Sequence, residues 1–117
     1  MSELYTQGDW TPTPGKEEAF VEAWVEFAGW ASTRPGAGTL RLMRDVRNWE
    51  RFVSFGRWDS ADDVRAWKSD PEFRERIARV LQHVDEFEPT ELVLVATAEG
   101  GSGTIEPAAR IEPVHAP

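Results

Sequence analysis

The spacing of apolar residues after Lys16 predicts an amphipathic helix. Apolar residues recur at three- and four-residue steps, which places them on one side of a helix; they are Phe20, Ala23, Trp24, Phe27 and Ala31. Glutamates mostly occupy the other side. Thr13 and Pro14 suit an N-cap and a first helical position, so we expect the helix to begin there and to run for about four turns.

A second helical region is predicted in two pieces. Ser60 and Asp63 have the spacing of a capping box, which predicts a helix start near Ala61. Asp70 followed by Pro71 then supplies a new N-cap and a favoured first residue, so the helix should stop and restart there. The second piece should run to about Val84. Its apolar stripe, suited to packing on a sheet, is Phe73, Ile77, Val80, Leu81 and Val84.

Four stretches are typical of β-strands: residues 4–10, 39–46, 51–58 and 92–96. The second alternates so that Arg44 shares a face with apolar residues, namely Leu40, Leu42 and Val46. The third also alternates and has apolar residues on both faces. The last is continuously apolar, which predicts a buried strand.

The order strand, helix, strand, strand, helix, strand is that of the ferredoxin-like α+β fold. Two helices then cover one face of a four-stranded antiparallel sheet. We expect this βαββαβ domain to occupy residues 1–98. Residues 99–117 are rich in Gly, Pro and Ala and are expected to form a C-terminal tail.

Composition narrows the possible partners. The 117-residue chain has the size of one domain, and 13 basic against 21 acidic residues give a net charge of -8. This negative net charge disfavours nucleic acid as a partner, because a nucleic-acid binder must neutralise phosphates.

The absence of cysteine excludes disulfides and thiolate chemistry and suits a reducing compartment. The first residues do not resemble a signal peptide and no apolar run is long enough to span a membrane, so we expect a cytoplasmic protein without a membrane partner.

Aromatic side chains are numerous for so short a chain: six Trp, six Phe and one Tyr. Large aromatics fill protein cores and also line pockets for flat apolar ligands. We therefore expect the partner to be a hydrophobic aromatic small molecule.

Four segments resemble the antibiotic biosynthesis monooxygenase (ABM) family of dimeric α+β barrel proteins: Gly8-Asp9-Trp10 and residues 14–20, 51–60 and 67–73. The resemblance extends over roughly residues 4–97. It implies a homodimer in which two sheets face one another, with a ligand pocket between the helices and the sheet of each protomer. The apolar residues on both faces of the expected sheet independently favour a homodimer, because one face would otherwise be an exposed apolar patch.

The superfamily includes cofactor-free oxygenases of aromatic polyketides, haem-degrading enzymes and other small-molecule enzymes. Trp67 matches a tryptophan that borders the pocket in the haem-degrading relatives. Those relatives carry an asparagine and an iron-ligating histidine where this chain has Gly8 and Ile77, so we expect no haem degradation. A two-histidine metal site would need both His83 and His115, and it would therefore require the tail to fold across the domain. We expect neither a metal nor another cofactor.

The candidate catalytic residues are His83 and Arg44. His83 lies on the flank of the second apolar stripe, where it is either a general base or a partly exposed structural histidine. Arg44 either holds a phenolate, enolate or carboxylate or pairs with an acid at a strand end. The candidate substrate-binding residues are Trp67, Trp24, Phe27 and Tyr5, for which packing is the alternative role.

A pocket with these residues cannot itself supply redox equivalents, so the substrate of an oxygenase would have to reduce dioxygen. The anion of a phenol, anthrone or hydroquinone is able to do this. On the family resemblance, the expected function is that of a cofactor-independent monooxygenase of the antibiotic biosynthesis type acting on an aromatic or polyketide-like small molecule. The alternatives are a non-catalytic small-molecule binding protein and a polyketide cyclase or isomerase using the same pocket.

Overall fold

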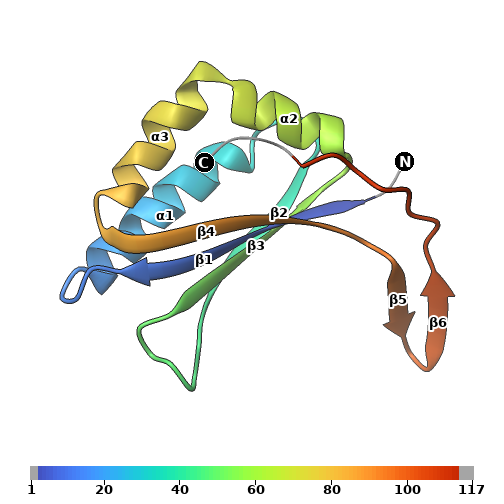
Figure 1. The fold of residues 1–117 in the computed structure, drawn as a ribbon, viewed down its shortest axis with the longest axis horizontal. Coiled ribbons are helices and arrows are strands. Elements are labelled where there is room, and N and C mark those ends of the chain that lie inside the picture. Colours follow the sequence, from blue (N-terminus) through green and yellow to red (C-terminus); the bar gives the residue numbers. More distant parts are fainter. Residues whose placement is uncertain (1–2, 114–117) are drawn as a thin grey trace.

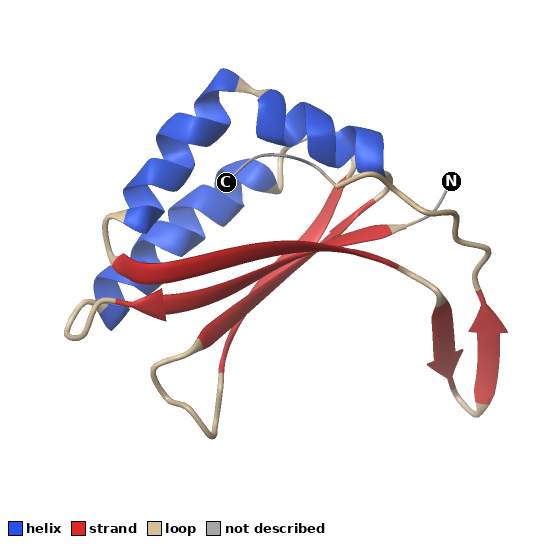
Figure 2. Ribbon diagram, viewed as in Figure 1, coloured by secondary structure: helices blue, strands red, loops and turns tan. Residues whose placement is uncertain are grey.

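The protein folds as the expected ferredoxin-like α+β domain. The computed structural model describes residues 3–113. Four antiparallel strands form a sheet in the order β2-β3-β1-β4, with bounds β1 (Leu4–Pro12), β2 (Ala37–Arg44), β3 (Phe52–Trp58) and β4 (Val84–Val93). The helices α1 (Glu17–Ala31), α2 (Ala61–Ser69) and α3 (Pro71–Leu81) cover one face of it (Figure 1). Within residues 3–113, no helix covers the other face (Figure 2). None of the described helices is long and apolar enough to cross a membrane.

The two predicted caps of the second helical region are confirmed. The Ser60 hydroxyl accepts a hydrogen bond from the Asp63 backbone N–H at 3.2 Å, and α2 begins at Ala61. The Asp70 carboxylate accepts one from the Glu72 N–H at 2.9 Å, with Pro71 as the first residue of α3. The helix ends at Leu81, earlier than predicted, because β4 begins at Val84.

Replacing the Asp70 cap should weaken the junction between α2 and α3. We expect Asp70→Ala to lower the free energy of unfolding by about 1 kcal/mol, the usual contribution of an N-cap. Urea denaturation measures this effect. Asp70→Asn is the matched control, because it retains a cap acceptor while removing the charge that also lies 3.7 Å from Arg34. Equal loss in both variants would mean that the ion pair, rather than the cap, is responsible.

The predicted start of α1 is wrong. The helix begins at Glu17 with Lys16 as N-cap and no side-chain cap, while Thr13 and Pro14 lie in the preceding turn. In this turn Gly15 has φ +88°, which glycine adopts readily and which a helix does not allow. The Thr13 hydroxyl instead donates to the Asp85 carboxylate at 2.7 Å.

The predicted final strand is also wrong in its position and burial. β4 begins at Val84, ahead of Pro89, and Leu92 is 41% exposed. The proline is tolerated because β4 is an edge strand that pairs only with β1 in the sheet. Leu92 points away from the helices, so its exposure follows from the uncovered face.

The glycine-rich region after β4 contains two further strands. β5 (Ala96–Glu99) and β6 (Ser102–Ile105) form a hairpin, and the expected boundary between residues 98 and 99 falls within β5. The hairpin projects away from the helices (Figure 1). The chain then returns to the domain, where Ile111 packs against the core.

Candidate functional site

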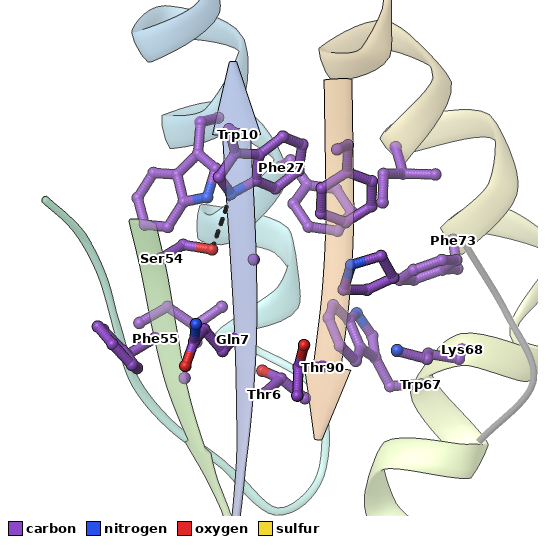
Figure 3. A pocket seen from close by; sticks show the side chains of 17 residues that line it. Thr6, Gln7, Trp10, Phe27, Ser54, Phe55, Trp67, Lys68, Phe73 and Thr90 are labelled. Carbon is purple, nitrogen blue, oxygen red and sulfur yellow. Dashed lines mark hydrogen bonds between the residues drawn. The ribbon is translucent and has the colours of Figure 1, made fainter. Parts of the chain in front are cut away.

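A pocket lies between the helices and the sheet of the protomer. Its empty volume is about 470 Å³, which includes open solvent at its mouth. The walls are rich in aromatic rings (Figure 3), with Trp10, Trp24, Phe27, Trp67, Phe73 and Phe87 among the lining residues.

Small residues in the middle of the sheet create this hollow. On the helix-facing side of β1 and β3, Gly8 lies opposite Ser54, and Thr6 lies opposite Gly56. Larger residues occupy both ends of these rows: Leu4, Trp10, Phe52 and Trp58. A Cβ atom on Gly8 would come within 2.6 Å of the Trp10 indole nitrogen, so the floor requires glycine there. Sequence analysis missed this pattern of small residues between large ones.

Hydrogen bonds and stacking hold the aromatic walls in place. The indole N–H of Trp10 donates to the Ser54 hydroxyl at 2.9 Å (Figure 3), and its ring stacks on Phe87 with centroids 3.9 Å apart. Trp67 stacks on Trp58 at 4.6 Å. Rings fixed in this way form a preorganised wall, which reduces the cost of ordering side chains on binding.

Three of the candidate binding residues come together in the pocket. Trp24 and Phe27 extend from α1 and Trp67 from α2, and all three line it. The indole nitrogen of Trp67 is buried and has no hydrogen-bond partner within residues 3–113.

The structure does not bring Tyr5 or Arg44 into this pocket. Tyr5 alternates with the buried Leu4 and so lies on the opposite face, where its hydroxyl donates to the Glu3 carboxylate at 3.2 Å. Burial, together with Glu3, raises the pKa of Tyr5 above its usual value. Arg44 ends β2, and its Nε donates to the Trp49 carbonyl at 2.6 Å while the guanidinium lies over the Trp49 ring. Arg44 therefore supports the loop between β2 and β3.

The candidate base His83 does not enter the pocket either. His83 lies in the turn between α3 and β4, outside the pocket lining, and its carbonyl accepts a hydrogen bond from the Thr13 N–H at 2.9 Å. His115 falls outside the described residues.

Lys68 is a charged pocket residue that sequence analysis missed. Its side chain is 5% exposed, and its Nζ lies 3.1 Å from Oε2 of Glu91 on β4. A lysine next to Trp67 on a short helix is ordinarily a surface residue, but here its side chain is buried and contacts Glu91 of β4. The sequence contains no local signal for this contact, since the partner is 23 residues away.

The family is established by comparison with known proteins. The model of the antibiotic biosynthesis monooxygenase family matches residues 4–79, which include β1 to β3, α1, α2 and most of α3. The chain belongs to this family. No curated protein matches the chain significantly.

Solved structures show the same ABM fold. SnoaB, a cofactor-independent oxygenase from Streptomyces nogalater, is 18% identical with a TM-score of 0.71, over 85% of this chain and 95% of that one. A Chloroflexus aurantiacus protein whose name places it among the antibiotic biosynthesis monooxygenases is 25% identical, with a TM-score of 0.68, over 86% and 100% of the two chains. A conserved protein from Methanosarcina mazei is 14% identical, with a TM-score of 0.71, over 79% and 92%.

Gly8 and Ile77, on which the expectation of no haem degradation rests, both line the pocket. Neither side chain can ligate iron or donate a hydrogen bond. Among residues 3–113, no group of three His, Asp or Glu side chains is arranged to hold a metal ion.

Proposed function

We propose that this ABM-family protein is a cofactor-independent monooxygenase acting on an aromatic or polyketide-like small molecule. The observation that carries the proposal is the pocket walled by Trp24, Phe27 and Trp67 between the helices and the sheet. The name of SnoaB, a cofactor-independent oxygenase of the same fold, supports this choice of chemistry.

In this proposal the substrate supplies the electrons. For an anthrone, deprotonation gives an anion that transfers electrons to dioxygen; the ring CH₂ becomes C=O, one oxygen atom enters the product, and the other leaves as water with the two hydrogens. The protein holds the flat ring between aromatic walls, keeps bulk water from the reacting carbon and stabilises the anion. The released proton passes to water at the open mouth of the pocket.

Oxygen consumption tests the proposal. Metal-stripped protein should accelerate oxygen uptake by an anthrone or hydroquinone without added flavin or nicotinamide, as followed with an oxygen electrode.

Trp24→Leu should raise the KM for this substrate by about 10-fold, because it removes a ring from the pocket wall. Trp30→Leu is the matched control: Trp30 is on the same helix but does not line the pocket. A parent protein that binds these aromatics but consumes no oxygen would contradict the proposal, and conversion without oxygen uptake would indicate a cyclase or isomerase.

We also propose that the protein is a homodimer formed through the uncovered sheet face, and that it acts in the cytoplasm. The face carries apolar side chains that the described residues leave accessible; Met43 is 45% and Leu92 is 41% exposed. A second copy of the same face would cover them, as expected of a self-complementary interface. The cysteine-free composition suits a reducing compartment.

A further inference from the structure

Lys68 occupies an unusual position for a lysine. The chain has two lysines; Lys16 is exposed at the start of α1, whereas the side chain of Lys68 is 95% removed from solvent. Burial of an ammonium is costly unless a counter-charge and hydrogen bonds compensate for lost hydration. Glu91 supplies the counter-charge, with 3.1 Å between Nζ and Oε2.

The two partners of this ion pair face the pocket differently. Lys68 lines the pocket, whereas Glu91 does not. Glu91 therefore holds the ammonium from outside the ligand space. An ammonium has three N–H donors, so the bond to Glu91 leaves two for a ligand. Figure 3 shows the Lys68 nitrogen at the same end of the pocket as Trp67, Thr6 and Thr90.

Two neighbouring groups give this end of the pocket further donors. The Trp67 indole N–H is buried without a partner in the described part of the chain, and an incoming acceptor would satisfy it. The Thr6 hydroxyl already accepts from the Trp58 indole at 3.2 Å, which leaves its own hydrogen to donate. The Trp10 ring, which stacks on Phe87, lies at the other end of the pocket (Figure 3).

The charge of the lining agrees with this arrangement. Among the described residues that line the pocket, Lys68 is the single ionisable side chain and none is acidic. The chain as a whole carries a net charge of -8. The pocket lining thus presents one cation within an acidic protein, and a charged hydrogen bond to this 5%-exposed side chain is stronger than in water.

We propose that the Lys68 ammonium and the Trp67 indole N–H bind an anionic oxygen at the edge of a flat aromatic ligand, and that Glu91 positions Lys68 for this contact. The ligand class is an aromatic phenolate, enolate or carboxylate bound as the anion. The inference rests on the pocket of the proposed function and deepens it, because the same contact would stabilise the substrate anion that reduces dioxygen. It assigns to Lys68 the role that the sequence suggested for Arg44.

A pair of probes that differ only in charge tests the inference without requiring catalysis. 2-Naphthoate and 2-naphthamide share a ring system, and calorimetric titration at neutral pH compares their dissociation constants. The parent should bind the naphthoate about 10-fold or more tightly than the amide, as expected for a buried charged hydrogen bond. Equal binding of the two probes would overturn the role of Lys68 and leave the aromatic pocket standing, whereas binding of neither would remove the pocket and the proposed function with it.

Variants assign the preference to one side chain. Lys68→Met combined with Glu91→Gln removes both charges without leaving a buried carboxylate unpaired, and it should abolish the preference for the naphthoate. Lys68→Arg retains a cation and should keep a preference, as should the matched control Lys16→Met. Glu91→Gln alone should reduce the preference, because it removes the carboxylate that positions Lys68. A double variant that still prefers the naphthoate would overturn the inference.

A spectroscopic measurement on the parent protein keeps the test decisive even where the double variant does not fold. In a ¹H–¹⁵N spectrum the Trp67 indole N–H, assigned by its loss in Trp67→Phe, should move downfield with 2-naphthoate and much less with 2-naphthamide. A purely structural Lys68–Glu91 ion pair would not produce this difference. Identical shifts with the two probes would contradict the proposal.

Discussion

Phe55→Arg is expected to convert a dimer into monomers. Phe55 lies on β3 in the sheet face that the helices leave uncovered, opposite Gln7 of β1 and Arg41 of β2. In the proposed dimer an arginine there would be buried without an acidic partner among these neighbours, and Arg41 would repel it. Burial of an unpaired charge costs several kcal/mol, so the dimer should weaken by about 1000-fold or more.

Light scattering coupled to gel filtration measures the effect. The parent should have twice the chain mass at micromolar concentration and Phe55→Arg the mass of one chain. Val25→Arg is the matched control, because Val25 is an apolar residue, 58% exposed, on α1 on the other side of the sheet. A parent that is monomeric at this concentration, or a Phe55→Arg variant that stays dimeric, would refute the proposed interface.

Trp58→Ala is expected to be the most destabilising single change in the core. Trp58 is fully buried, its ring stacks on Trp67 with centroids 4.6 Å apart, and its indole N–H donates to Thr6 at 3.2 Å. Truncation would leave a large cavity and an unsupported pocket wall. We expect the free energy of unfolding to fall by about 3–5 kcal/mol.

Urea denaturation at fixed protein concentration measures this loss, since association would add a concentration-dependent contribution. Trp49→Ala is the control, because Trp49 is 61% exposed in the loop between β2 and β3. Trp49→Ala should lower the free energy of unfolding much less, mainly because the contact of Trp49 with Arg44 is lost. Equal losses in the two variants would show that the core does not depend on the Trp58–Trp67 stack.

The features predicted correctly from sequence depend on neighbours along the chain. The caps at Ser60 and Asp70 require only a side chain and a backbone N–H two or three residues away, so local spacing is sufficient to find them. The amphipathic face of α1 follows in the same way from helical periodicity.

The incorrect boundaries have long-range causes. Thr13 was expected to cap α1, but its hydroxyl bonds to Asp85, 72 residues away. The last strand was expected at residues 92–96, but β4 begins at Val84 and includes Pro89, whose missing N–H is tolerable at an edge position. Neither pairing can be recognised from a local pattern.

By itself the sequence determined the order of the elements up to β4, the two-faced sheet, the resemblance to the ABM family and the aromatic character of the interior, because each depends on periodicity or on residue type. Only the tertiary structure decided which side chains meet. Strand register placed Tyr5 on the face away from the pocket and kept the small residues Gly8 and Gly56 beneath it. The tertiary fold also brought Lys68 of α2 to Glu91 of β4. A shift of one residue along a strand reverses the face of every side chain, so the chemistry of this pocket is set by packing between distant elements.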